Sequence, residues 1–141
     1  MSLIKERLSN AFILTNELLE SIAESNLKLK IPNVPSNTIG GQYWCVIRAR
    51  QSYIKTIENG GEWMGFTCDL KNPHSKEEIE KLLKSTFKDL EHLKLDEKNE
   101  KVLIKLVELF EHEIQHHGQL IRFIYANKLK FPESWKKKYT V

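Results

Sequence analysis

Hydrophobic side chains recur along this chain at a spacing of three and four residues, which is the period of one face of an α-helix. The first such segment runs from about Leu3 to Leu27. No stretch alternates between apolar and polar residues for long enough to form a core strand. The inward positions of the first segment, all apolar except Thr15, are Ile4, Leu8, Ala11, Phe12, Thr15, Leu18, Leu19 and Ile22.

Three further segments show the same period. The second runs from about Asn37 to Glu58, with Ser36 or Asn37 available as N-cap and Gly60-Gly61 as the stop. The third begins at Ser75, which stands three residues before Glu78 as in a capping box, and its buried face includes Leu83 and Leu90. The fourth runs from about Asp96 to Asn127. Its stripe consists of Leu103, Leu106, Val107, Phe110, Ile114, Ile121 and Ile124.

Four amphipathic segments without strands predict an all-α four-helix bundle. The 141 residues suit one domain, residues 1–141, with a core large enough to need no disulfide or metal for stability. In the tail from Phe131 to Val141, aromatic residues alternate with lysines. We expect Phe131, Trp135 and Tyr139 to pack across the bundle and the lysines to face solvent.

Composition narrows the range of partners. Hydrophobic residues make up 40% of the chain and charged residues 29%, and the net charge is +3, which is too mild to indicate nucleic acid binding. No apolar run approaches the length of a membrane span, and the N-terminus lacks a signal-peptide pattern. We therefore expect a cytoplasmic protein without a membrane partner. In that compartment Cys45 and Cys68 are expected to be thiols or metal ligands.

Three histidines lie within six residues of the fourth segment. His112 and His116 are four residues apart, so they share a helix face at a spacing that one divalent cation can bridge. Neutral imidazoles suit Zn, Ni, Fe or Cu, and a metal is favoured because two buried imidazoles would otherwise need two separate hydrogen-bond partners. His117 falls inside the apolar stripe, which favours a buried histidine with a hydrogen-bond partner and no metal.

Residues 112–116 also spell H-E-x-x-H, the motif of zinc metalloproteases. The longer form of that motif has Gly and His where this chain has Gln119 and Arg122. Zinc proteases of this type also use a sheet to align the peptide, and no strand is predicted. The pattern therefore argues against a protease.

The second segment offers another metal ligand. Cys45, Ala49, Ser52 and Thr56 share a face of small side chains, which either packs closely against a neighbour or lines a cavity. Cys45 is the strong metal ligand among them. The alternative for Cys45 taken by itself is a small buried hydrophobic residue, and that alternative is the commoner one for a free cysteine.

The chain resembles the DinB/YfiT-like superfamily of bacterial metal-binding four-helix bundles. The resemblance rests on Ile39-Gly40 leading into Trp44-Cys45, and on His112-x-x-x-His116 followed by Gly118-Gln119-Leu120. His117 stands where the family pattern commonly has Arg. The family binds a divalent metal through three histidines, two of which correspond to His112 and His116. The remaining ligand position corresponds to Cys45, so the resemblance implies either a Cys/His/His site, chemically sound for zinc with an open fourth position, or a weakened or empty one.

Relatives in this superfamily include thiol S-transferases and isomerases that use a low-molecular-weight thiol and act on small-molecule substrates. In them the metal lowers the pKa of the thiol. The resemblance thus implies a Zn or Ni site, a thiol cofactor and a homodimer. Arg48 could pair with a carboxylate of that cofactor, although its angle from Cys45 on the helix favours a solvated arginine. Trp44 and Trp63 could wall a pocket, although aromatic residues of the core are the commoner case. A second reading is a non-catalytic, stress-associated binding protein with a structural or vestigial metal site. Cys68 is a candidate accessory ligand.

Overall fold

A computed structural model describes residues 2–141, which form five α-helices and no strand. The four long helices are α1 (Leu3–Ser21), α2 (Ile39–Glu58), α3 (Lys76–His92) and α4 (Glu100–Ala126). A short 3-10 helix, η1 (Glu24–Lys28), follows α1, and α5 (Glu133–Tyr139) lies near the C-terminus. The prediction of an all-α chain is therefore confirmed.

Two helix starts differ from the prediction. Thr38, rather than Ser36 or Asn37, caps α2 by accepting a hydrogen bond from the Gly41 amide, and Asn99 caps α4, so that helix begins at Glu100 rather than at Asp96. Ser75 caps α3 as predicted, because its hydroxyl accepts from the Glu78 amide. The Glu78 side chain instead binds the amides of Lys71 and Asn72.

The first segment also ends earlier than its apolar pattern suggests. The helix ends at Ser21, and Leu27 reaches the core from η1 instead. The apolar stripe itself ends at Ile22, and Leu27 is fully buried although it lies outside the helix. The tail forms the short helix α5, and the aromatic packing predicted for it is confirmed, since Trp135 is fully buried and Phe131 nearly so.

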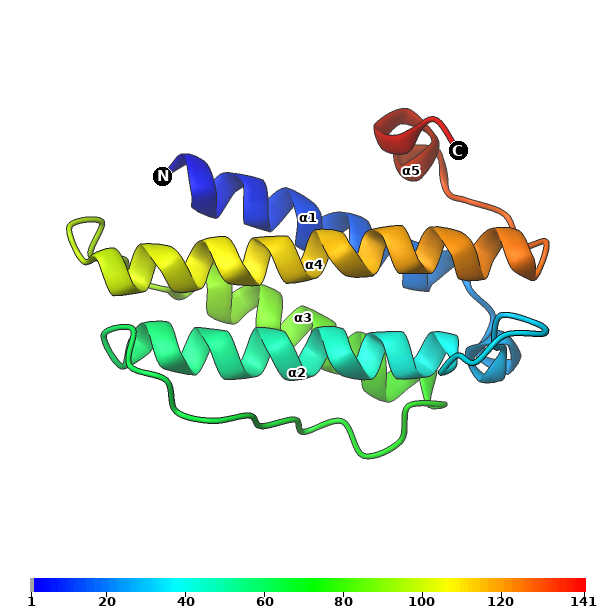
Figure 1. The fold of residues 1–141 in the computed structure, drawn as a ribbon, viewed down its shortest axis with the longest axis horizontal. Helices are drawn as coiled ribbons and strands as arrows, with labels where there is room; N and C mark the ends of the chain where they lie inside the picture. Colours follow the sequence, from blue (N-terminus) through cyan, green and yellow to red (C-terminus); the bar gives the residue numbers. More distant parts are fainter. Residues whose placement is uncertain (1) are drawn as a thin grey trace.

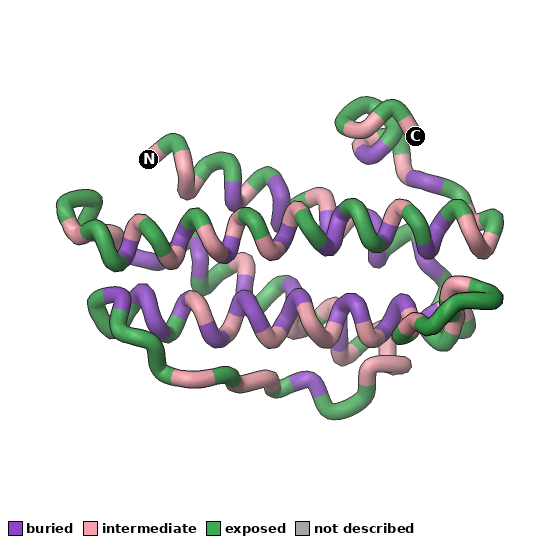
Figure 2. The backbone as a smooth tube through the Cα atoms, in the orientation of Figure 1, coloured by how far each residue is buried: buried purple, intermediate pink, exposed green. Residues whose placement is uncertain are grey.

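The long helices pack as two layers. Helix α4 lies against α1 and α2, and α3 lies against the other sides of the same two helices (Figure 1). Helix α5 docks on α1, where the Trp135 indole nitrogen donates to the Leu14 carbonyl at 2.7 Å. Figure 2 shows the buried positions following the inner faces of the helices. No helix in residues 2–141 combines the length and the apolar character needed to cross a bilayer.

The core consists of two apolar clusters with buried polar residues at the level between them. One cluster surrounds Leu18, Ile47 and Leu120, and the other surrounds Phe12, Ile54 and Leu106. Each long helix contributes polar residues at the intermediate level. These residues, which we call the polar layer, are Thr15, Arg50, Thr86, Glu113 and His117.

A long connection from α2 to α3 runs beside α2 (Figure 1). The Ser52 hydroxyl accepts from the Thr67 amide at 2.9 Å, which holds the connection against the middle of α2. At its end, the Pro73 carbonyl lies so close to Gly40 that an added methyl group would overlap it. Gly40, one of the residues that carry the family resemblance, therefore allows the connection to close against the start of α2.

Candidate functional site

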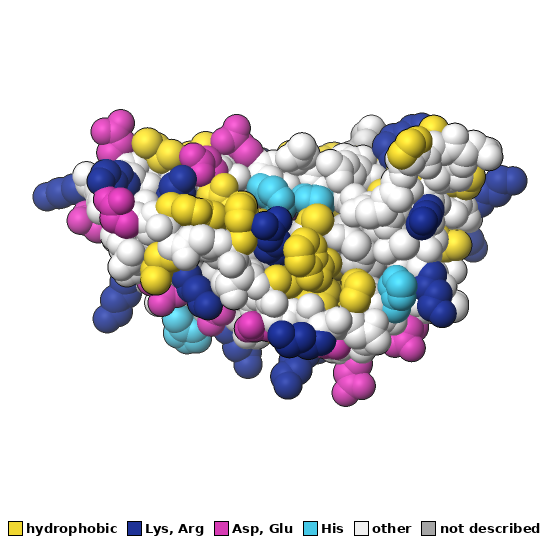
Figure 3. Space-filling view, turned by 60° about the horizontal axis from the view of Figure 1, so that its bottom comes forward, with side chains coloured by type: hydrophobic (Ala, Val, Ile, Leu, Met, Phe, Trp, Pro, Cys, Tyr) yellow, Lys and Arg dark blue, Asp and Glu magenta, His cyan; other side chains and the backbone are white. Residues whose placement is uncertain are grey.

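His112 and His116 lie together on α4 as predicted, with ring centroids 4.5 Å apart. His116 is buried and His112 half-buried, and α2 packs against α4. Figure 3 shows two neighbouring histidine side chains on one face of the molecule, bordered by a basic side chain and by hydrophobic side chains. The pair therefore lies at the edge of the core rather than within it.

Gln42 on α2 is the hydrogen-bond partner of His116. The Gln42 side-chain oxygen lies 2.6 Å from His116 Nδ1, and the Gln42 amide nitrogen donates to Asn37 at 3.0 Å. The bond to Asn37 orients the Gln42 amide so that its oxygen faces the imidazole. Because that oxygen can only accept, Nδ1 carries the proton and Nε2 keeps a free lone pair. An outer amide or carboxylate commonly orients a metal-binding histidine in this way.

His112 has a buried ring nitrogen without a protein partner. Its Nδ1 makes no hydrogen bond to any of residues 2–141. Burial, together with the positive charge of Arg48, lowers the pKa of His112 despite the opposing charge of Glu113. Burial lowers the pKa of His116 to about 4. Both imidazoles are therefore neutral near pH 7, which is the form that binds metals.

Cys45 is half-buried on α2. Burial raises the pKa of its thiol, and the nearby Arg48 charge opposes that rise. Within residues 2–141, no three or more His, Cys, Asp and Glu side chains are grouped so that they could hold a metal ion together. The structure thus brings the two histidines together, and a role for Cys45 as the third ligand stays a prediction.

Arg48 is half-buried and lies near two aromatic rings. Its guanidinium carbon lies 3.7 Å from the Phe66 ring centroid and 5.4 Å from that of Trp44, and it forms no ion pair within the described chain. The Cys68 thiol lies 3.8 Å from the Trp44 carbonyl. The α2–α3 connection therefore brings Phe66 and Cys68 beside the α2 positions that the resemblance singled out. Trp63 is 43% exposed and packs edge-on against Phe66.

The glutamate of the H-E-x-x-H pattern is held within the polar layer. Arg50 binds both carboxylate oxygens of Glu113, at 2.7 and 3.1 Å, and both side chains are fully buried. The Thr15 hydroxyl also donates to Glu113, at 2.5 Å. Arg50 helps keep the pKa of Glu113 below its usual value, although burial acts in the opposite direction. A fully paired, buried carboxylate cannot serve as the general base of a protease.

His117 belongs to the same buried network, as its position in the apolar stripe predicted. Its Nδ1 lies 2.6 Å from the Tyr139 hydroxyl, and its Nε2 lies 2.7 Å from the Thr15 hydroxyl and 3.1 Å from the Ala11 carbonyl. With Tyr139 donating to Nδ1, the Nε2 proton faces Thr15, whose own proton faces Glu113. Both nitrogens are satisfied, so His117 has no free lone pair for a metal.

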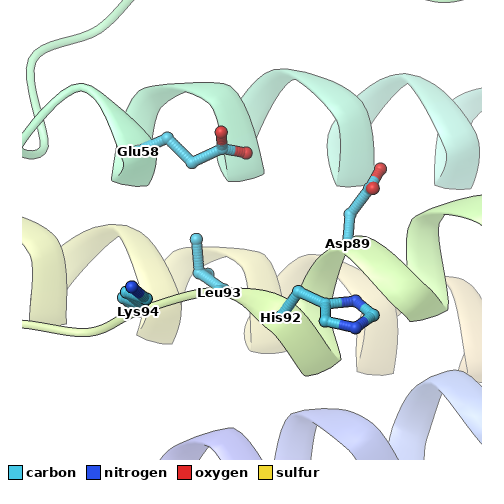
Figure 4. A pocket seen from close by; sticks show the side chains of 5 residues that line it. All are labelled: Glu58, Asp89, His92, Leu93 and Lys94. Carbon is cyan, nitrogen blue, oxygen red and sulfur yellow. The ribbon is translucent and has the colours of Figure 1, made fainter.

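A hollow of about 260 Å³ has Gln42 among its lining residues. It is lined by Ile31, Pro35, Ser36, Asn37, Gln42, Gln119, Arg122 and Phe123. A wider hollow of about 410 Å³ lies between α2 and the end of α3, with Glu58 and Asp89 at its sides (Figure 4). The second hollow contains none of the residues of the histidine site, whereas the first shares Gln42 with it.

Sequence reasoning missed Gln42 and Arg50. Both are polar residues on the buried face of a helix, and that position is the signal that could have identified them. Neither a protein-family model nor a curated protein matches this chain. The functional argument therefore depends on the geometry described above, together with the resemblance carried by the motifs.

Proposed function

We propose that this protein is a DinB/YfiT-like four-helix-bundle protein that binds a divalent metal ion, Zn or Ni, through His112 and His116, with Cys45 as the third ligand. In this proposal the protein is a metal-dependent enzyme that acts on small molecules, and the activity we propose is that of a thiol S-transferase. The observation that carries the proposal is the Gln42–His116 hydrogen bond, which leaves the lone pair of His116 Nε2 free to bind a metal. The unpartnered His112 nitrogen supports it.

The residues present suit such an ion. Two neutral imidazoles and a thiolate form a good donor set for zinc and leave one position open for a substrate or a thiol. When bound, the metal supplies positive charge that lowers the pKa of a coordinated thiol. Burial disfavours the Cys45 thiolate and Arg48 favours it, so the loss of the Cys45 proton is coupled to metal binding.

The other residues of the site have supporting roles in this proposal. Gln42 orients the His116 ring and is itself held by Asn37. The Arg48 guanidinium, held by the rings of Trp44 and Phe66, offers a positive charge to a carboxylate of a thiol cofactor.

The second candidate is a non-catalytic, stress-associated binding protein whose metal site is structural or vestigial. The lack of a three-donor group in the described chain favours it, as does the raised pKa of Cys45. The two candidates differ in whether a ligand position remains open. Cobalt-loaded protein distinguishes them, because added glutathione changes the sulfur-to-cobalt absorption band only where a position is open.

Elemental analysis of protein purified without a chelating tag tests the metal site. We expect one Zn or Ni per chain, lost in His112→Ala and in His116→Ala, because two remaining ligands hold a divalent ion poorly. The variant His92→Ala, at an exposed histidine of α3, is the matched control and keeps the metal. Metal retained in both site variants would contradict the proposal.

Substitutions at Cys45 test the third ligand separately. Cys45→Ser weakens binding because it removes the thiolate, and Cys45→His restores or strengthens it by recreating the three-histidine set of the family. A folded Cys45→His protein that holds no metal would mean that Cys45 is not the third ligand position.

A further inference from the structure

The hollow beside Gln42 has features of a binding site for an anion. We infer that it is a subsite for a small carboxylate that Arg122 contacts, and the hollow shares Gln42 with the histidine site. That the hollow binds a carboxylate does not depend on the proposed function. That this carboxylate belongs to the substrate rests on the proposed function.

The charge of the lining favours an anion. Arg122 is the one charged residue among the eight that line the hollow, and no carboxylate lies among them. Within the described chain, Arg122 takes part in no ion pair. The hollow also adjoins the start of α2, whose first turn contains no acidic residue, and the partial positive charge at a helix N-terminus adds to the attraction.

Three of the side chains that line the hollow carry amide groups, which can donate hydrogen bonds. Gln42 is 4% exposed, and its amide nitrogen donates to Asn37 at 3.0 Å, which leaves the second amide proton unused. The side-chain amides of Asn37 and Gln119 supply further donors. A planar guanidinium together with amide donors matches a carboxylate, and a single guanidinium matches its single charge.

The size of the hollow limits the ligand. A volume of about 260 Å³ corresponds to roughly nine waters at about 30 Å³ each, which suits a small organic acid. Ile31, Pro35 and Phe123 provide apolar contacts for a short carbon chain. The hollow shares Gln42 with the histidine site, because the Gln42 side-chain oxygen lies 2.6 Å from His116 Nδ1.

Butyrate tests the subsite in metal-free, full-length protein labelled with nitrogen-15. We expect the side-chain amide signals of Asn37, Gln42 and Gln119 to shift saturably with butyrate. Butyramide, which has the same shape without the charge, should bind at least about tenfold more weakly, and Arg122→Gln should weaken butyrate binding by a similar factor. Arg7→Gln, at an arginine that lines a different hollow, is the control and leaves binding unchanged.

Equal binding of butyrate and butyramide, no response of these amides, or full butyrate affinity in Arg122→Gln would overturn the inference. Displacement of butyrate by a lower concentration of inorganic phosphate would overturn the assignment to carboxylates. The metal content of the same protein is measured separately. If the protein binds butyrate but no metal, the proposed function fails and the subsite stands, and if it binds metal but not butyrate, the subsite alone fails.

A second measurement connects the subsite with the histidine site. In cobalt-loaded protein, 3-mercaptopropionate should bind more tightly than 3-mercaptopropionamide, and Arg122→Gln should remove that preference. If Arg48→Gln removed the preference for the acid over the amide and Arg122→Gln did not, Arg48 would be the residue that binds the carboxylate. The inference that Arg122 binds the substrate carboxylate would then be wrong.

Discussion

Replacing Glu113 by Gln should destabilise the fold strongly, because it leaves the Arg50 charge buried without its partner. Both side chains are fully buried, and two Arg50 nitrogens bind the carboxylate. Removing one member of a buried ion pair typically costs about 3–5 kcal/mol. Arg50 keeps weaker partners in Asn16, Thr86 and the Phe12 ring, so we expect the lower end of that range, about 3 kcal/mol.

Urea unfolding followed by the helical circular dichroism signal measures this loss. In a chain of this size, about 3 kcal/mol corresponds to a fall in the melting temperature of roughly 10 °C. Glu111→Gln is the matched control, since Glu111 is exposed on the same helix, and it should change the free energy of unfolding by less than about 0.5 kcal/mol.

Arg50→Met combined with Glu113→Leu should recover stability relative to Glu113→Gln, because no unpaired charge then remains. A loss below about 1 kcal/mol in Glu113→Gln would refute the reasoning. It would mean that water reaches the Arg50 guanidinium or that the carboxylate is not its main partner.

Four further predictions concern the site, the core and assembly. Gln42→Leu should lower metal affinity about 10–100-fold in a chelator competition, with Gln51→Leu, on the same helix, as the unaffected control. His116 and His117 have pKa values of about 4 in the folded protein, against an ordinary value of 6.5, so the unfolded chain takes up protons at a higher pH than the folded one. The free energy of unfolding of the metal-free protein should therefore fall as the pH is lowered from about 6.5 to 4. A free energy of unfolding that does not change over this range would contradict the prediction. Trp135→Ala should cost about 3–5 kcal/mol in urea unfolding, because that indole is fully buried, and Trp63→Ala, at a 43% exposed site, should cost much less. Light scattering should give twice the chain mass of 16.6 kDa if the protein is the homodimer that the family resemblance implies, whereas a monomeric mass at micromolar concentration would count against it.

Local spacing was sufficient to predict the four long helices and the histidine pair, but not η1 or α5. A helix repeats every 3.6 residues, so a stripe of apolar positions identifies its buried face, and two residues four apart must share a face. The same reasoning placed His117 in the core. It placed the end of the first helix too late, at about Leu27, because Leu27 is buried from the 3-10 helix that follows α1.

The environment of each candidate residue was decided only by tertiary packing. Gln42 lies 74 residues from His116, and Glu113 lies 63 residues from Arg50, so no local pattern pairs them. Packing of α2 against α4 brings Gln42 to the His116 ring and, one turn earlier along α4, encloses Glu113 in an ion pair with Arg50. The sequence alone determines which helix faces are apolar, but which side chains meet depends on how the helices pack, because hydrogen bonds and ion pairs form between atoms a few ångströms apart whatever their separation along the chain.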